Sequence, residues 1–361
     1  MTSSPSDPRP PHAWIGTYPA QGPGTTAGTG EGVWRVTVDP TTGALDGRLA
    51  VETPTPSFLA LAPDGRTLYA AGERTQGTLT AFAVGADGSL TERHAVTSDG
   101  AWPCHLLVHP SGRALYATNY ESGSLVVVPL APDGGFADDV VASGRPAQTF
   151  AHVGSGPRAD RQEGPHAHSS VLLGDRLLVA DLGTDELRRF RVLADGSVAE
   201  DGVAYRFAPG TGPRHVAVAA GAASDVLYVV GELTATVHVL AWDRVAGTAR
   251  ELQVLPACAS PLASGEHVYP AHVVVDGDRV LVSVRGADVL ATFAAGPDGV
   301  LEHVADAPVG AWPRHFGLVG GWVVVAAQNA ARVTALAWDG VVPGPTAGDL
   351  AVPHPACVLP G

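Results

Sequence analysis

One stretch of the chain decides the fold: WPCHLLVHPSGRALYATNY, residues 102–120. A proline, Pro103, stands near its start. A short apolar run, a tight turn at Pro-Ser-Gly-Arg and a second apolar run follow. Related segments occupy residues 212–233, 269–286 and 312–329. Short apolar runs bounded by Gly, Pro, Asp and Asn indicate strands and turns, and no segment carries a sustained helical period. The sequence therefore predicts an all-β protein.

The repeat has seven copies. Its reference position, about two residues after the turn proline, is occupied in turn by Phe58, His105, His168, His215, His272, His315 and Cys357. The mean spacing of about 50 residues is the length of a four-stranded propeller blade. Turns of two kinds, Pro-Asp-Gly-Arg at residues 63–66 and Ala-Asp-Gly at 86–88, fall after the first and third runs of a blade. We expect a seven-bladed β-propeller of four-stranded antiparallel blades.

The two ends of the chain are expected to share one blade. The segments 14–18, 32–39 and 45–52 supply only three strands, and residues 354–359 supply the missing innermost strand. Pairing the ends closes the ring and removes two exposed sheet edges. We expect residues 12–361 to form one domain and residues 1–11, which are polar and proline-rich, to be a disordered tail.

Charge and composition exclude several classes of function. The formal net charge is −14, which disfavours nucleic acid and anionic membranes as partners. The sequence contains no lysine, so all 22 basic residues are arginine, and neither Schiff-base catalysis nor a P-loop is available. No run of eighteen apolar residues and no signal-peptide pattern occurs. The three cysteines are far apart and odd in number, which predicts buried free thiols and a cytoplasmic location. We also expect a monomer or a weak homo-oligomer.

Because the blades repeat around the central channel, residues at equivalent positions of the repeat should form a circle around it. The reference residues form one circle, and the residues that follow the second strand of each blade form another: Tyr18, Glu73, Tyr120, Leu182, Glu232, Arg285 and Gln328. The first strand begins where the antiparallel second strand ends, so both circles should rim the same mouth. Arg214 and Arg314 each precede a reference histidine. Arginine forks bind carboxylate or phosphate, and His with Glu can exchange protons near neutral pH, so the rim suits a small anionic substrate.

A structural role is the alternative for these residues. Repeat histidines such as His105, His272 and His315 can hydrogen-bond backbone groups of the next blade. Glu232 beside an arginine can be a salt-bridged strut or a working pair, because a buried charge needs a partner. We expect no metal or other cofactor. His166 and His168 lack an indicated third ligand for zinc, and the rim has few carboxylates and amides for a larger divalent ion.

Several short motifs carry a family resemblance. They are GSGP at residues 154–157, RQ at 161–162, PHAHS at 165–169, ADLG at 180–183, GPRH at 212–215, EL at 232–233, NY at 119–120 and PACV at 355–358. Together they resemble the seven-bladed lactonase family, which includes propeller-type 6-phosphogluconolactonases. The resemblance runs from about residue 14 to residue 359 and implies that the chain opens a sugar lactone.

The resemblance also implies site residues. A carboxymuconate lactonising enzyme of the same fold family has a His, two Arg and a Glu as proposed active-site residues, and their motifs match His168, Arg214, Arg285 and Glu232 here. Predicted substrate contacts are His166, His215, Tyr120, Arg314, His315, Gln328 and Glu73. Gly231 stands where the family commonly has Asn, and Val284 stands where it commonly has Asn or Asp. These two departures leave the identity of the substrate open.

Three functions follow as hypotheses. The favoured one is hydrolysis of 6-phosphogluconolactone or a related aldonolactone. Arg214 and Arg285 would hold the anionic group, one of His168 and Glu232 would take a proton from water, and the other would protonate the leaving alkoxide. A lactonising cycloisomerase acting on a carboxymuconate-type diacid is the second hypothesis, and a non-catalytic binding scaffold is the third. Arg158 and Arg161, in the loop 154–164, would add an anion contact.

Overall fold

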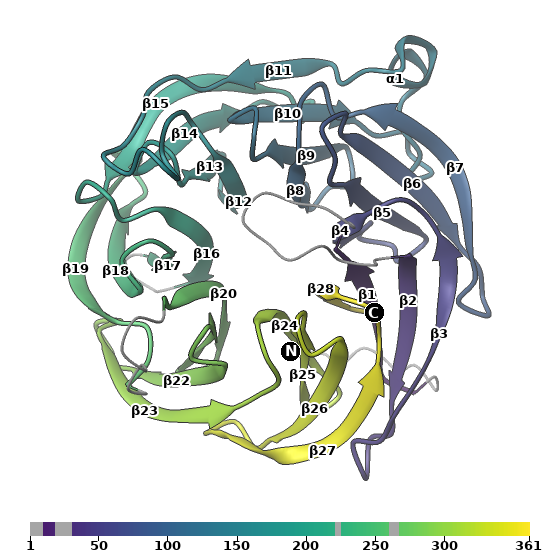
Figure 1. Cartoon of the computed structure of the whole chain (residues 1–361). Helices are drawn as coiled ribbons and strands as arrows, with labels where there is room; N and C mark the ends of the chain where they lie inside the picture. Colours follow the sequence, from purple (N-terminus) through teal and green to yellow (C-terminus); the bar gives the residue numbers. More distant parts are fainter. Residues whose placement is uncertain (1–9, 19–30, 221–224, 260–266) are drawn as a thin grey trace.

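Seven four-stranded antiparallel sheets surround a central axis in the computed structural model, as the repeat predicts (Figure 1). The structure describes residues 10–18, 31–220, 225–259 and 267–361. Most of the predicted N-terminal tail, residues 1–9, lies outside the described residues. The innermost strand of each sheet runs beside the axis, and the outermost strand lies on the perimeter (Figure 1).

We number the blades 1 to 7 in chain order, with the shared blade last. From inside to outside, blade 1 consists of β4 (Pro56–Leu61), β5 (Thr67–Gly72), β6 (Thr78–Val84) and β7 (Leu90–Thr97), and blade 2 consists of β8 (Pro103–Val108), β9 (Ala114–Asn119), β10 (Ser124–Pro129) and β11 (Gln148–Ala151). Blade 3 consists of β12 (Ala167–Leu173), β13 (Arg176–Asp181), β14 (Glu186–Val192) and β15 (Val198–Arg206), and blade 4 consists of β16 (Pro213–Ala219), β17 (Asp225–Gly231), β18 (Thr236–Asp243) and β19 (Thr248–Pro256). Blade 5 consists of β20 (Tyr269–Asp276), β21 (Arg279–Arg285), β22 (Val289–Ala295) and β23 (Leu301–Pro308), and blade 6 consists of β24 (Pro313–Val319), β25 (Trp322–Ala327), β26 (Arg332–Trp338) and β27 (Pro343–Ala351). Blade 7 consists of β28 (Pro355–Pro360), β1 (His12–Thr17), β2 (Gly32–Val38) and β3 (Leu45–Glu52).

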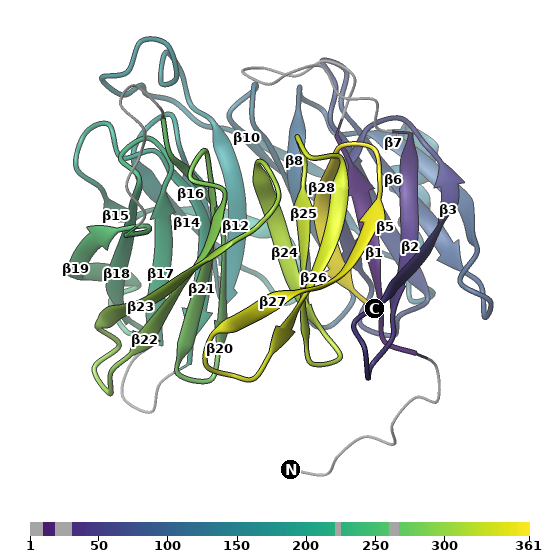
Figure 2. The same cartoon turned by 60° about the horizontal axis from the view of Figure 1, so that its bottom comes forward.

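The ends of the chain close the ring in blade 7. The C-terminal strand β28 is innermost there and pairs antiparallel with β1, with Ile15 opposite Val358. Figure 2 shows β28 and β1 side by side between blades 6 and 1. Both residues are almost fully buried, so the closing contact is part of the hydrophobic core. The predicted pairing of the termini is confirmed.

The predicted turns also occur where expected. Gly65 and Gly112, between the first and second strands of blades 1 and 2, have φ near 71°, which suits glycine best. Gly88 plays the same part between the third and fourth strands of blade 1, with φ of 75°. The short helix α1 (Asp138–Ser143), between β10 and β11, was not predicted, because six residues are too few to carry a helical period.

Neighbouring blades pack through apolar faces and through a repeated tyrosine contact. Side chains of adjacent sheets interlock; Tyr69 and Leu115, for example, belong to one buried cluster between blades 1 and 2. The Tyr69 hydroxyl donates a 2.5 Å hydrogen bond to the Gly134 carbonyl of the next blade. Tyr116 and Tyr228 make the same kind of contact with the next blade's turn, at 2.9 and 3.0 Å. In blades 1, 2 and 4, this bond ties the second strand to a turn of the next blade.

A one-residue irregularity recurs at the start of every innermost strand. In blade 2, for example, Pro103 is opposite Asn119 and His105 is opposite Thr118, so Cys104 is left without a partner residue. The residues displaced in this way are Ser57, Cys104, His168, Arg214, Ala271, Arg314 and Ala356. In blade 4 the shift also spans His215. A β-bulge re-aims the side chain of the extra residue, so these seven positions form a circle of their own, which we call the bulge circle.

The bulge circle corrects the sequence alignment at one blade. Ala167 is opposite Asp181 and Ser169 is opposite Ala180, so Ser169 is equivalent to His105 and His168 is equivalent to Cys104. His168 was wrongly grouped with the reference histidines. Its structural equivalents are the bulge residues Arg214 and Arg314.

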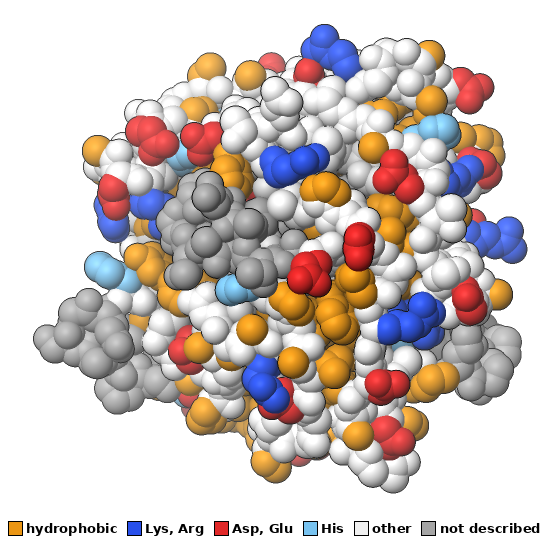
Figure 3. All heavy atoms as spheres, turned by 45° about the vertical axis from the view of Figure 1, so that its right-hand side comes forward, with side chains coloured by type: hydrophobic (Ala, Val, Ile, Leu, Met, Phe, Trp, Pro, Cys, Tyr) orange, Lys and Arg blue, Asp and Glu red, His pale blue; other side chains and the backbone are white. Residues whose placement is uncertain are grey.

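One face of the molecule is mixed in charge. On the face shown in Figure 3, acidic and basic side chains lie scattered among one another, and neither sign of charge forms a continuous patch. Among the described residues, no helix has the length and apolar character needed to cross a bilayer.

Ring closure makes a stability prediction. Replacing Val358, which is 1% exposed, with Asp puts an unpaired carboxylate between β1 and blade 6, and should cost at least about 3 kcal/mol or prevent folding. The control Val245→Asp changes a side chain that is 96% exposed and should cost less than about 0.5 kcal/mol. Urea unfolding followed by circular dichroism measures both, and equal stability of the two variants would contradict the closure.

Candidate active site

A polar cavity of about 310 Å³ opens at the end of the channel where the bulges lie. Its lining comes from the bulge circle and from the circle that follows the second strands: Cys104, His168, Arg214, Arg314, Tyr18, Glu73, Tyr120, Glu232 and Arg285, with His166, Arg161, Tyr269 and Trp312 beside them and with the exposed acidic residues Glu121, Asp160 and Glu163. This volume is typical of a small-molecule site. All four predicted catalytic residues meet here, as do the predicted substrate contacts His166, Tyr120, Arg314 and Glu73.

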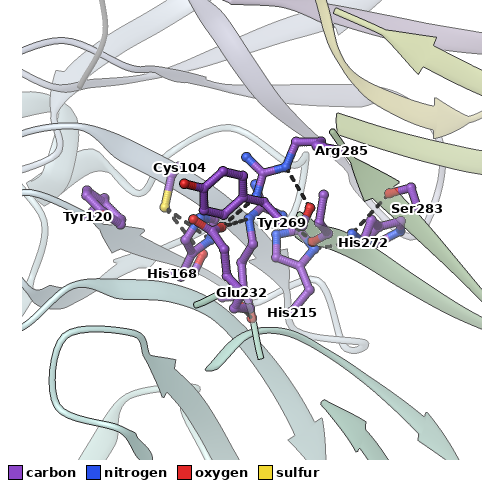
Figure 4. Close-up of polar contacts among 12 residues, drawn as sticks. Cys104, Tyr120, His168, His215, Glu232, Tyr269, His272, Ser283 and Arg285 are labelled. Carbon is purple, nitrogen blue, oxygen red and sulfur yellow. Dashed lines mark hydrogen bonds and ion pairs between the residues drawn. The ribbon is translucent and has the colours of Figure 1, made fainter. Parts of the chain in front are cut away.

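Glu232 is the electrostatic centre of the cavity. Its Oε2 lies 2.7 Å from Arg285 Nη2 and 2.9 Å from Arg214 Nε, and its Oε1 lies 2.6 Å from Arg161 Nη2. Figure 4 shows Glu232 beside Arg285, with His168 on its other side. The three guanidinium groups come from blades 4 and 5 and from the loop before blade 3. One carboxylate therefore holds three cations around the same space.

This arrangement keeps Glu232 ionised. Burial raises its pKa, but the charges of Arg285, Arg161 and Arg214 outweigh burial and hold the pKa well below the usual range. A carboxylate in this state carries no proton to donate and has little tendency to accept one. Of the two roles expected for Glu232, the ion-paired strut is the one that the geometry supports.

Two buried side chains, Asp185 and Gln162, hold the chain segments that carry the arginines. Asp185 accepts hydrogen bonds from the backbone N–H groups of Gly210 and Gly212, both at 2.7 Å, just before Arg214. Gln162, next to Arg161, donates to Asp185 Oδ1 at 2.9 Å. Gly212 has φ of 63°, and a Cβ there would lie 2.5 Å from Leu233, so this turn requires glycine.

A second buried aspartate, Asp181, holds the segment that contains His166 and His168. Asp181 Oδ1 accepts a 2.9 Å hydrogen bond from the backbone N–H of His166, and its Oδ2 contacts His152 Nδ1 at 2.7 Å. Gly183 allows close approach here, since a Cβ would lie 1.9 Å from the Gly164 carbonyl oxygen. Asp181 and Gly183 belong to the ADLG motif, so that motif supports His166 and His168 from outside the cavity.

His168 is buried beside Cys104. The Cys104 Sγ lies 3.9 Å from His168 Nδ1 and 3.3 Å from the His168 carbonyl oxygen (Figure 4). Burial and the Arg214 charge lower the pKa of His168 well below its usual value, so the imidazole is neutral. Burial raises the pKa of Cys104 to about 12, so the thiol is protonated and unreactive. The expectation that Cys104 acts as a small buried hydrophobe is consistent with this state.

The opposite side of the cavity has a different electrostatic character. The Tyr18 hydroxyl donates a 3.0 Å hydrogen bond to Glu73 Oε1, and the Arg314 guanidinium lies 4.2 Å from the centre of the Tyr18 ring. Arg314 makes no ion pair within 4.0 Å of any described carboxylate, unlike Arg161, Arg214 and Arg285. Its charge is therefore available to a ligand.

The remaining predicted contacts do not line this cavity. His215 and His315 line a smaller adjoining chamber, and Gln328 is fully buried and lines neither. The chamber and the cavity share four lining residues, Glu73, Cys104, Arg214 and Arg314. His105 Nδ1 accepts from the Ser170 backbone N–H at 3.4 Å, and His315 Nδ1 accepts from Val358 at 3.2 Å. These are bonds to the next blade, as the structural alternative predicts. Substrate contact by His215, His315 or Gln328 stays a prediction.

The histidine cluster fits a metal poorly. His215, His272 and His315 each offer a ring nitrogen within 4.8 Å of the others. His315 Nδ1 already accepts a backbone hydrogen bond, so the neutral ring carries its proton on Nε2 and has no free lone pair. His215 and His272 face each other through their Nδ1 atoms at 2.8 Å, and the Arg214 charge lies close enough to lower the pKa of all three rings.

Sequence reasoning missed several residues of the cavity. Tyr18 was expected on the rim and does line the cavity, but Cys104 was expected only as a buried thiol. Trp312 lines the cavity as well, and the centre of its ring lies 5.4 Å from the Arg285 guanidinium. Arg161 was expected as an anion contact, and its ion pair with Glu232 was not foreseen. The loop of Arg161 has no repeat register that could have located it.

Comparison with known proteins identifies relatives. The model of the family "Lactonase, 7-bladed beta-propeller" matches residues 12–360. A 6-phosphogluconolactonase of Bacillus subtilis is 32% identical over 84% of this chain and 83% of its own. The structure of a periplasmic gluconolactonase of Pseudomonas aeruginosa is 27% identical, with a TM-score of 0.84 over 97% of this chain and 98% of that one. A Lactobacillus plantarum protein has a TM-score of 0.85 at 28% identity, over 97% and 99% of the two chains.

The Glu232 cluster predicts a pH-dependent loss of stability. In Glu232→Gln, Arg214 and Arg285 keep their charges but lose their buried carboxylate, which should cost about 3–5 kcal/mol at pH 7. The pKa of Glu232 is lowered on folding, so its contribution is complete above its ordinary pKa of 4.5 and is lost as the pH falls through the folded value. The difference between wild type and variant should shrink in acid below pH 4.5.

Urea unfolding at pH 7, at pH 5 and at lower pH measures this difference. Glu92→Gln, at an exposed position on β7, is the control and should match wild type within about 0.5 kcal/mol. A pH-independent difference between wild type and Glu232→Gln would contradict the ion-pair account.

Proposed function

The chain belongs to the seven-bladed β-propeller lactonase family, and from this premise we propose that it hydrolyses an anionic sugar lactone, of which 6-phosphogluconolactone is the type. One observation carries the choice of an anionic substrate. Arg314 lines the cavity without a carboxylate partner, while Glu232 already binds the three other arginines. Glu121, Asp160 and Glu163 also line the cavity, but their side chains are exposed. Arg314 is thus a cation of the cavity with no described carboxylate within 4.0 Å, and such a group binds an anion strongly in a partly desolvated space.

Arg314 is the proposed clamp for the phosphate. Its guanidinium lies 4.2 Å from the centre of the Tyr18 ring, and the side chain lines the cavity. Arg285 can assist, because only two of its nitrogens are engaged, by Glu232 and by the Tyr269 carbonyl. This assignment shifts the main anion contact from Arg214, whose Nη1 donates to the Ala271 carbonyl and whose Nε faces Glu232.

His168 is the proposed base that activates water. Its neutral imidazole can accept a proton, but burial and the Arg214 and Arg314 charges make it a weak base in the free protein. A bound anion would offset those charges and raise the pKa of His168 towards the working range. Substrate binding and base strength are then coupled, so an anionic lactone is favoured over a neutral one in turnover as well as in binding.

Direct attack by water is favoured over a covalent intermediate. The Cys104–His168 pair resembles the nucleophile and base of a thiol hydrolase. The pKa of Cys104 is raised to about 12, because burial disfavours the thiolate. A protonated thiol is a poor nucleophile, and the lactone needs only a polarised carbonyl, a base and a proton donor.

The clamp predicts a substrate-dependent effect. Arg314→Met should lower kcat/KM for 6-phosphogluconolactone by about 10- to 100-fold, the worth of a charge-assisted hydrogen bond of about 1.5–3 kcal/mol. The same variant should change the value for unphosphorylated gluconolactone by less than about threefold. A pH-stat assay corrected for spontaneous hydrolysis measures both. Equal rates of the wild type on the two lactones would rule out a phosphate clamp.

The base assignment predicts a contrast between two neighbours. His168→Gln should lose about 10²-fold or more in kcat, whereas Cys104→Ala should keep activity within about threefold of wild type. His94→Gln, at an exposed position on β7, is the matched control for the histidine change. Loss of turnover in Cys104→Ala, with an unchanged melting temperature, would instead support a thiol nucleophile.

A further inference from the structure

The cavity contains two glutamates in opposite electrostatic states. Glu232 contacts three guanidinium groups within 2.9 Å. Glu73 makes no ion pair with a described arginine within 4.0 Å, although it is only 4% exposed. Its Oε1 accepts from Tyr18, and its Oε2 is buried without a hydrogen-bond partner of acceptable geometry among the described residues. A buried carboxyl oxygen in this situation is stable when it carries a proton and points it at a ligand.

Several groups around Glu73 act on its pKa. Burial raises the pKa, and Arg314, the Ser57 and Tyr18 hydroxyls and Arg214 act against burial without outweighing it. Cys104, His215 and His315 line the small chamber that Glu73 also lines. Burial raises the pKa of Cys104 to about 12 and lowers the pKa of both histidines well below its usual value, so all three groups are neutral. Glu73 and Glu232 thus occupy environments that push their proton affinities apart, which is how one site provides an acid and an ionised carboxylate together.

The position of Glu73 suits the leaving oxygen of the proposed substrate. Tyr18 contacts both Glu73 and Arg314, so the carboxyl group lies next to the proposed phosphate clamp. In a six-membered aldonolactone phosphorylated at its terminal carbon, the ring oxygen is bonded to the carbon that carries the phosphorylated CH₂ group. A phosphate at Arg314 therefore brings the ring oxygen, which becomes the alkoxide, to the Glu73 side. The carbonyl carbon is bonded to the other side of the ring oxygen, towards His168.

We propose that Glu73 is the general acid of the reaction, an assignment that rests on the proposed lactone hydrolysis. Water attacks the carbonyl carbon and gives one proton to His168, forming a tetrahedral oxyanion. When the oxyanion collapses, the bond between carbonyl carbon and ring oxygen breaks, its electron pair stays on the ring oxygen, and the Glu73 Oε2 proton goes to that oxygen. The products are the open hydroxy acid, a Glu73 carboxylate and protonated His168. Proton return from His168 to Glu73 through solvent restores the enzyme.

A change of leaving group tests this step. Glu73→Gln keeps the shape but cannot deliver a proton, so kcat for 6-phosphogluconolactone should fall by about 10²-fold or more. The ring-sulfur analogue of the same lactone leaves as a thiolate, which is far less basic than an alkoxide and needs little protonation. Its turnover by the variant should stay within about threefold of wild type. Glu92→Gln, the same carboxyl-to-amide change at an exposed position on β7 away from the cavity, is the control and should leave both substrates unaffected.

A second variant tests the same step by pH. The Tyr18 hydrogen bond stabilises the charged form of Glu73, so Tyr18→Phe should raise the pKa of Glu73 and move the basic limb of the pH–rate profile to higher pH. In Glu73→Gln this limb should disappear. A purely structural role of Glu73 would move neither limb.

The outcomes separate this assignment from the proposed function. A wild type without lactonase turnover would contradict the proposed function itself. An active wild type whose Glu73→Gln variant loses both substrates equally, or shows only a higher KM, would overturn the acid assignment alone. Full activity of that variant on 6-phosphogluconolactone would overturn it as well.

Discussion

A one-residue bulge at the start of each innermost strand is the constraint on which the site depends. An extra residue in one strand turns a side chain away from the sheet face that its neighbours occupy. In blades 2, 3, 4 and 6 the extra residues are Cys104, His168, Arg214 and Arg314, and all four line the same cavity. Sevenfold repetition of a backbone irregularity thus builds a ring of side chains that no single blade could assemble.

The two sides of the ring differ in how their charged side chains are paired. Glu232 collects three arginines on one side, which stabilises the folded ring and fixes the wall beside His168. On the other side Tyr18 contacts both Glu73 and Arg314, which form no ion pair within 4.0 Å, so one carboxyl group and one guanidinium group keep their capacity for a ligand. In the proposed reaction, the proton acceptor, the anion clamp and the proton donor lie on blades 3, 6 and 1.

Much of this architecture could be predicted from the sequence because repetition is visible in residue order. The blade number, the strand pairing of the two termini and the circle containing Glu73, Glu232 and Arg285 all follow from aligned copies of one motif. The bulge could not be seen, since PHAHS offers two histidines and only strand pairing shows that Ser169, not His168, is equivalent to His105. Contacts between blades were also hidden: nothing in the sequence joins Arg161 to Glu232 across 71 residues.

One measurement tests the central claim most directly: a crystal structure of the protein with 6-phosphogluconate, the open product, bound. The account predicts the phosphate against Arg314 and Tyr18, the carboxylate near His168, and the hydroxyl that was the ring oxygen within hydrogen-bond distance of Glu73. Product bound outside the cavity, or bound with its phosphate against His168 and its carboxylate at Arg314, would contradict the account.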